Sequence, residues 1–406
     1  MCRAEIVLPE ISVASPRIKS VQWHRNGSPV SWPVTDLARH RPLYFSFDIL
    51  SSDNDEEILP WLRAKIEHRS AEWEKENISD NEFLSGFNIS DIGQGKPSIG
   101  GITTPYRHFE LEVPPIDILP MISGNYLLKI YDDNNPDSIL ICAPFMIEEQ
   151  STHISGSVNV VTDIDFKKSH QQLELSIRPI NIPSTVRPQE LKVYTNQNNT
   201  PGTMRFLGFP SIVTPTDIKF NHKKELIYDA GNEYRRMEII DINTPMLHVD
   251  HIEWYHPFYH QILSTDYQRK DKPYLMEYNN NGIFVIRDYN SDNSDIEADY
   301  CVVHFSLDGS EIPDNSNIFI EGDFTQRSLS PEYKMSWDKN NNIYYKSLLL
   351  KQGAYDYKYI TPDSKNSIYE VEGNNFETAN KYNVAVYYRV PGERFDRLAA
   401  TTTLSL

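Results

Sequence analysis

The stretch YFSFDI at residues 44–49 decides the fold class, because apolar and polar side chains alternate along it. Phe45, Phe47 and Ile49 take one face of this stretch, and the residues between them take the other. A repeat of two residues is typical of a half-buried β-strand. The same alternation recurs in LELSIR at 173–178, LKVY at 191–194 and VAVY at 384–387. We therefore predict an all-β protein.

The composition supports strands rather than long helices. The 406 residues include 24 Tyr, 17 Phe and 6 Trp, which suit the pleated surface of a sheet. They also include 26 Pro, and each proline inside a helix costs about 3 kcal/mol. Residues 59–77 are ambiguous, because their Glu, Lys, Ala and Leu content suits a helix. Leu62, Ala64 and Ile66 nevertheless alternate with other residues, so we predict a strand there.

The charge balance and the cysteines argue against several classes of function. Lys+Arg 39 against Asp+Glu 57 gives a net charge of −18, which disfavours binding to nucleic acid or to anionic membranes. No run of 18 apolar residues predicts a membrane span, and no signal peptide follows Met1, so export would need a preceding leader. Cys2, Cys142 and Cys301 are far apart, so we expect neither a zinc site nor a disulfide framework.

Two breaks in the strand pattern predict three structural units. Polar residues around 148–152 end one series of strands, and a new alternating series begins at Ile154. The run of Asn, Ser and Asp between 288 and 297 has no periodicity and suits a linker. The predicted units are 1–149, 150–295 and 296–406. We expect three consecutive β-sandwiches that form an elongated rod.

The last unit contains a strand–turn–hairpin pattern. IFIEGDF at 318–324 runs into a turn, KMSWD at 334–338 begins a hairpin, and GAYDYKY at 353–359 follows a glycine turn. This pattern resembles the immunoglobulin-like E-set sandwich related to glycogen-binding modules. Such modules stack sugar rings on tryptophans, whereas the corresponding turn here carries Arg327 on what we expect to be an exposed loop. The resemblance therefore implies a sandwich without its sugar platform, with Trp337 in the core.

Motifs in the first two units resemble the N-terminal region of the type IX secretion system plug protein family of Bacteroidetes. They are Trp73 followed by NEFLSGF at 81–87, SGNYLLKIY at 123–131, and KPYL at 272–275 before NGIFVI at 281–286. They occur along the chain in the family's order. The sequence departs from the family pattern at one turn, where it has TPGT at 200–203 and the family has an R-W-D-N-like turn.

This resemblance implies a periplasmic protein on the inner side of the outer membrane. It would close the inner mouth of the large outer-membrane β-barrel translocon of the type IX system by protein–protein binding. Its partner would be that barrel, and on its own the protein would be a monomer that neither spans the membrane nor binds nucleic acid. The alternative is a periplasmic or surface glycan-binding protein.

The motifs that mark enzymes and metal sites are missing from the sequence. There is no G-x-S-x-G, no H-E-x-x-H and no Walker loop, so we expect no catalytic residues and no enzyme activity. His248, His251, His256 and His260 are the richest histidine cluster, but Pro257 interrupts it and strand spacing separates the side chains. We therefore expect no metal and no cofactor.

Two groups of aspartates have simple structural interpretations. Residues 132–137 lack the spacing of a calcium loop and are typical of a hairpin turn. Asp163 and Asp165 would share one face of a strand, where carboxylates protect an exposed edge from pairing more often than they act as acid and base. Neither group is expected to be a site.

The candidate partner-binding residues are aromatic side chains in two loops. The loop 86–104 is glycine-rich and carries Phe87. The turn 254–259 holds four aromatic residues among six, namely Trp254, Tyr255, Phe258 and Tyr259. Aromatic residues on rigidly supported loops are typical anchors of protein interfaces.

Overall fold

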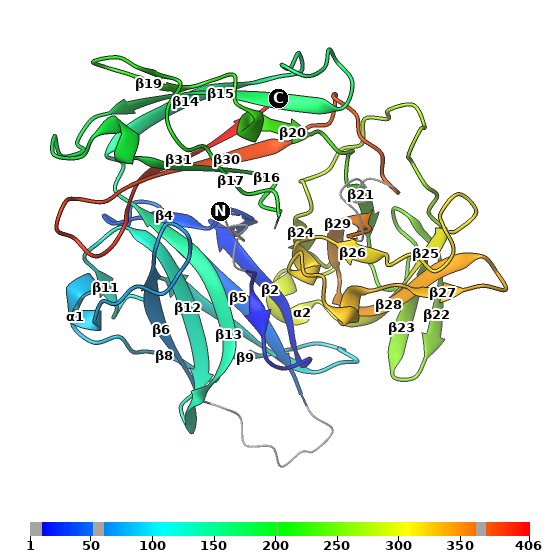
Figure 1. Cartoon of the computed structure of the whole chain (residues 1–406). Coiled ribbons are helices and arrows are strands. Elements are labelled where there is room, and N and C mark those ends of the chain that lie inside the picture. Colours follow the sequence, from blue (N-terminus) through cyan, green and yellow to red (C-terminus); the bar gives the residue numbers. More distant parts are fainter. Residues whose placement is uncertain (1–9, 52–60, 201, 363–370) are drawn as a thin grey trace.

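A computed structural model describes residues 10–51, 61–200, 202–362 and 371–406 of the chain (Figure 1). Strands account for 47% of the described residues and helices for 5%, which confirms the prediction of an all-β protein. The strand predicted within 59–77 forms as Leu62–Arg69. Met1, Cys2 and the start of that predicted segment lie outside the described residues.

The first sandwich packs two sheets around a core that includes Phe45, Phe47 and Tyr126. One sheet has the order β3-β2-β5-β10-β9, with strands Ser28–Pro29, Ile18–Arg25, Leu43–Leu50, Tyr106–Val113 and Lys96–Pro97. The other has the order β1-β13-β12-β6-β8, with strands Ser12–Val13, Asn135–Glu148, Gly124–Asp132, Leu62–Arg69 and Ser90–Gly93, and β4 (Val34–Asp36) joins β13. A small pair, β7 (Leu84–Ser85) and β11 (Leu119–Pro120), follows helix α1 (Asp80–Phe83).

The second sandwich is built from two separate parts of the chain. One sheet comprises β14 (Thr152–Asn159), β15 (His170–Pro179), β19 (Ile218–Phe220), β18 (Ile212–Val213) and β20 (Ile227–Asp229). The other has the order β17-β16-β30-β31, with strands Arg205–Phe206, Lys192–Gln197, Lys381–Tyr388 and Arg397–Ser405. Their shared core joins Leu173 and Phe220 to Tyr382 and Val384.

The third sandwich lies between those two parts in the sequence. One sheet comprises β21 (Arg235–Glu238), β29 (Gly353–Ile360), β24 (Phe284–Ile286) and β26 (Phe319–Glu321). The other has the order β22-β23-β25-β28-β27, with strands Val249–Tyr255, Phe258–Leu263, Tyr300–Asp308, Ile343–Lys351 and Ser336–Asp338. Helix α2 (Ser294–Glu297) precedes β25. Trp337 packs against this core, 4.4 Å from the Tyr344 ring.

The sheets divide the chain differently from the predicted units 150–295 and 296–406. Strands β21 to β24 belong with the third sandwich, whereas β30 and β31 return to the second, where β30 pairs with β16 along 192–197. The alternation of apolar and polar residues does not predict this return, because the sequence of a strand does not show which distant strand it pairs with. The acidic stretch 288–297 is also more than a linker, since it forms α2 and its backbone accepts hydrogen bonds from the first sandwich.

The three sandwiches contact one another in a triangle and do not lie end to end as the expected rod (Figure 1). Tyr387 of the second sandwich donates to Asn125 of the first, with 2.7 Å between Oη and Oδ1. The backbone N of Ala379 donates to the Glu233 carboxylate at 2.9 Å, near the third sandwich. Buried apolar residues also bridge the first sandwich to each of the other two.

Candidate partner-binding surface

Four of the predicted aromatic residues lie on the β22–β23 hairpin, at one end of the third sandwich. Tyr255 and Phe258 form the last cross-strand pair of the hairpin, and Trp254 pairs with Tyr259 beside them. The rings of Trp254 and Tyr259 are 4.6 Å apart, so each restricts the other. Trp254 is 49% exposed and Tyr255 is 58% exposed, whereas Phe258 and Tyr259 are half-buried. The hairpin therefore presents two exposed rings on a supporting base.

Phe87 lies on the first sandwich and is 86% exposed. It follows β7, and the paired strand β11 brings further exposed apolar side chains to the same region, namely Ile116, Leu119 and Met121. The predicted loop 86–104 is not wholly irregular, because β8 and β9 form within it. Figure 1 shows β11 and the β22–β23 hairpin on opposite sides of the view, so Phe87 and the hairpin are separate surfaces.

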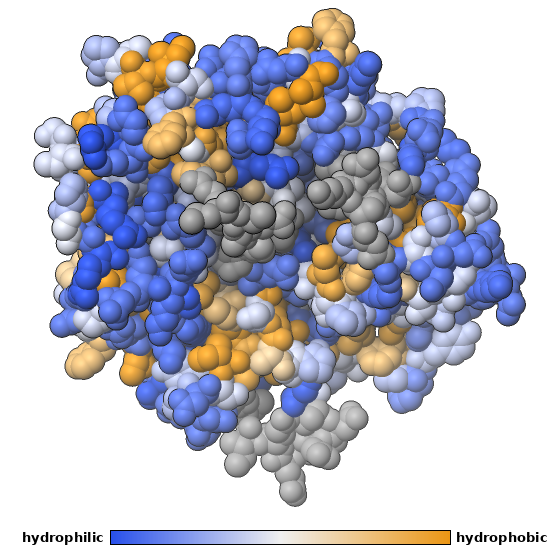
Figure 2. Space-filling view, viewed as in Figure 1, coloured by the Kyte–Doolittle hydropathy of each residue, from blue (hydrophilic) through white to orange (hydrophobic). Residues whose placement is uncertain are grey.

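A third exposed aromatic surface escaped the sequence argument. The segment 273–278 reads PYLMEY, and its Leu275, Met276 and Tyr278 are all exposed, Tyr278 by 81%. Tyr274 holds the segment in place, because its hydroxyl donates to the Glu233 carboxylate at 2.7 Å. The segment lacks strand or helix periodicity, and only the apolar run itself could have drawn attention to it. On the face in Figure 2, hydrophilic residues dominate and apolar groups occur in scattered clusters.

The predicted histidine cluster does not form one site. His260 contacts His304, with 2.8 Å between Nδ1 and Nε2. His251 pairs with the neighbouring Asp250 at 2.8 Å, on the exposed face of β22. His248 lies 3.2 Å from the buried Asp266. The histidines thus have separate local partners.

The two groups of aspartates lie in turns. Asp132 accepts a hydrogen bond from the backbone N of Asn134 at 3.1 Å, in the hairpin turn expected between β12 and β13. Asp163 and Asp165 do not share a strand face as predicted, because both lie in the connection between β14 and β15. There Asp165 accepts a hydrogen bond from the backbone N of Ser169, which stabilises the turn.

Arg327 is inside the protein and not on the exposed loop that the sequence suggested. Its side chain is only 4% exposed, and Nη1 lies 2.7 Å from the Glu321 carboxylate. Its Nε lies 2.6 Å from Asp323, and Nη1 also donates to the Tyr234 hydroxyl. The carboxylates explain why a cation is tolerated there, since they compensate its desolvation. This position offers no surface for stacking a sugar ring.

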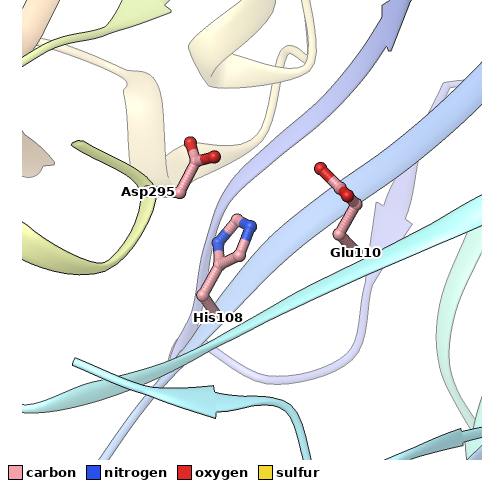
Figure 3. Close-up of side chains that lie close together, drawn as sticks. All are labelled: His108, Glu110 and Asp295. Carbon is pink, nitrogen blue, oxygen red and sulfur yellow. The ribbon is translucent and has the colours of Figure 1, made fainter. Parts of the chain in front are cut away.

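One group of side chains in the described residues has the composition of a metal site (Figure 3). One ligand atom each from His108, Glu110 and Asp295 lies within 4.8 Å of the other two. His108 and Glu110 are two residues apart on β10 and therefore share a face of the strand. Asp295 comes from α2, at the other side of the contact between the first and third sandwiches.

None of the described helices is long and apolar enough to cross a membrane. Residues 18–149 match the family model described as "Type 9 secretion system plug protein 1st domain". The chain is also similar to the crystal structure of a hypothetical protein from Parabacteroides merdae, with 33% identity and a TM-score of 0.90. That similarity covers 98% of this chain and 99% of the other. No curated protein matches the chain.

Proposed function

This chain belongs to the type IX secretion system plug protein family, and from that premise we propose that it occludes the inner mouth of the system's outer-membrane β-barrel translocon. The match over residues 18–149 carries the proposal, because it associates the chain with type IX secretion. The protein would act from the periplasm and would keep the pore closed while no client is in transit.

A rigid body favours this mechanism, since a plug must keep its shape against a wide opening. The contacts between the sandwiches include buried polar groups that pair across the interface. Lys351 of the third sandwich lies 2.6 Å from Asp48 of the first, and both are essentially inaccessible to solvent. Separating the sandwiches would break this ion pair and leave one or both charges without a partner. The free-energy cost of that loss opposes hinge motion between the sandwiches.

The exposed aromatic surfaces supply the binding residues in this proposal. Interfaces depend on a few aromatic anchors surrounded by a polar rim. Trp254 and Tyr255 are such candidates, because both are exposed and each pairs across the hairpin with a half-buried aromatic residue, Tyr259 or Phe258. Phe87 is a second candidate on a different sandwich. Small contacts at separate points would hold the plug and still permit its release.

The proposed action is steric, so it requires neither catalysis nor a cofactor. The competing proposal of glycan binding rested on the likeness of the third sandwich to glycogen-binding modules. Because Arg327 is buried against Glu321 and Asp323, the turn lacks the exposed stacking face that such binding needs.

The experiment is affinity capture combined with a permeability assay in the native host. The tagged protein should recover a very large outer-membrane barrel, and deletion of the gene should leave the barrel assembled but leaky to large antibiotics. The paired substitutions Trp254→Ala and Tyr255→Ala should reduce recovery of the barrel. Phe209→Ala is the matched control, because Phe209 is an exposed aromatic residue of the second sandwich outside these surfaces.

Two results would contradict the proposal. One is unchanged outer-membrane permeability in the deletion strain, together with no barrel in the captured material. The other is retention of the protein on polysaccharide columns at the level of a known lectin, which would favour glycan binding. If capture succeeds but Trp254 and Tyr255 have no influence, the plug role stands and the binding surface lies elsewhere.

A further inference from the structure

We infer that His108, Glu110 and Asp295 form a binding site for a divalent transition cation, with Zn²⁺ as the best-suited ion. The three ligand atoms lie within 4.8 Å of one another, and they come from two different sandwiches (Figure 3). His108 and Glu110 project from β10, and Asp295 of α2 lies on the other side of the His108 ring from Glu110 (Figure 3). The site would therefore connect the first sandwich to the segment that enters the third.

The His108 ring is already oriented for this role. Its Nδ1 lies 2.7 Å from Oδ1 of Asp48, the residue directly opposite on β5. His108 is only 7% exposed. Among the described residues, none forms a hydrogen bond with its Nε2, and the ring lies between Asp295 and Glu110 (Figure 3). A carboxylate that fixes one imidazole nitrogen while the other is left for the ion is the usual outer support of a zinc-binding histidine.

The position of Asp295 is fixed by the same buried network. Its backbone carbonyl accepts hydrogen bonds from Lys351 Nζ at 2.7 Å and from the Tyr106 hydroxyl at 3.3 Å. Lys351 also pairs with Asp48, so a single ion pair supports two of the three candidate ligands. These contacts hold the Asp295 backbone in place and leave its exposed carboxylate free to turn toward the ion.

Glu110 completes the set on the outer side of the site. It lies on the same face of β10 as His108, and its carboxylate is 3.4 Å from Nε2 of His24 on the neighbouring part of the sheet. His24 thus places a second imidazole beside the three candidate ligands. Since Glu110 and Asp295 are both exposed, small rotations of their side chains can bring the carboxylates closer to His108.

The ligand types indicate which ion the site prefers. Zn²⁺ is bound by imidazole nitrogen and carboxylate oxygen at about 2.0–2.2 Å, so tetrahedral ligand atoms are about 3.3 Å apart. The observed spread of up to 4.8 Å needs a modest contraction on binding. Ca²⁺ and Mg²⁺ prefer oxygen ligands alone, so the imidazole disfavours them. A bound ion would link the first and third sandwiches at their solvent-facing edge.

The test uses the full chain, stripped with EDTA and titrated with ZnCl₂ in a calorimeter. We expect one ion per chain, and at least tenfold weaker binding for Glu110→Gln and for Asp295→Asn. Both substitutions keep the side-chain shape, and thermal unfolding without metal verifies that the variants are folded. Co²⁺ should give visible d–d absorption with the wild-type chain that is lost in the two variants, whereas Ca²⁺ should not compete.

The matched control is His251→Ala, because His251 lies beside Asp250 and Glu253 in an exposed group of similar composition. Its removal should leave Zn²⁺ affinity and stoichiometry unchanged. Absence of Zn²⁺ binding to the folded wild-type chain would overturn the inference. Affinity within twofold of the wild type in both Glu110→Gln and Asp295→Asn would do the same, as would loss of the binding in His251→Ala.

Discussion

Replacing Lys351 with methionine removes the cation of the buried ion pair with Asp48 and keeps the length of the side chain. Lys351 and Asp48 are 1% and 0% exposed, so water cannot replace the lost ammonium group. The Asp48 carboxylate would keep hydrogen bonds from His108 Nδ1 and from the Tyr300 hydroxyl, each at 2.7 Å. The variant therefore measures how much free energy of unfolding is lost when the buried Asp48 charge between two sandwiches is only partly compensated.

The size of the effect follows from the burial of the pair. Removing one partner of a buried ion pair costs about 3–5 kcal/mol. Because two neutral or titratable donors remain on Asp48, we expect the lower end, about 3 kcal/mol. An unfolding entropy of about 2.1 cal/mol/K per residue gives about 0.85 kcal/mol/K for this chain, so the melting temperature should fall by about 3–4 °C.

The assay is thermal unfolding of the full chain at pH 7 with EDTA present, so that metal binding does not contribute. The double variant Asp48→Asn, Lys351→Met removes both charges and should recover most of the lost stability, to within about 1 kcal/mol of the wild type. The reasoning fails if Lys351→Met alone has no measurable effect. It also fails if the double variant is as unstable as the sum of the two single variants.

Further predictions concern other buried charges and the domain organisation. Burial acts to raise the pKa of Asp266, but Arg235 and other donors outweigh it and lower the pKa to about 2. The resulting stabilisation is present above about pH 4 and is lost as the pH falls from 4 to 2, so Asp266→Asn should flatten that part of a urea-midpoint profile and cost about 2 kcal/mol at pH 7. The pKa of Asp356 shifts in the opposite direction, because burial raises it to about 6. Stability should therefore decline as the pH rises from 4 to 6, and Asp356→Asn should abolish this decline and be more stable at pH 7 by up to about 3 kcal/mol in the same assay. A fragment of residues 297–406 should lack a cooperative unfolding transition by circular dichroism, since its last two strands belong to the second sandwich; a cooperative fragment would restore the predicted boundary. The full chain should migrate unretarded in native gels containing glycogen, because Arg327 is buried, and retardation would contradict that argument.

The strands themselves were predictable because each carries its own alternation. Phe45 and Phe47 are buried in the core, as the stretch 44–49 indicated. Asp48, on the other face of the same strand, is fully buried against Tyr300 and Lys351. Local pattern reveals that a face is polar, and it does not reveal that another sandwich covers that face with matching polar groups.

The candidate sites were predictable only in part, for a related reason. An exposed aromatic hairpin is contiguous in sequence, so the turn 254–259 could be found from its composition. The His108, Glu110 and Asp295 group combines residues almost two hundred positions apart, and no spacing rule connects them. The predicted exposure of Arg327 was wrong for a different reason. Its partners Glu321 and Asp323 are close to it in the sequence, but nothing in the sequence indicated that the side chain is buried.

The return of β30 and β31 to the second sandwich has a consequence for the order in which the protein matures. Strand β30 lies inside its sheet, between β16 and β31, and so the second core cannot close before residues 381–405 are available. The ribosome delivers the chain from its N-terminal side, so the third sandwich can form before the last two strands of the second are available. During that interval β16 has an unpaired edge and Leu173 and Phe220 lack their covering layer. Chaperones would therefore bind most readily at this stage, when the incomplete second sandwich exposes an unpaired strand edge and apolar side chains.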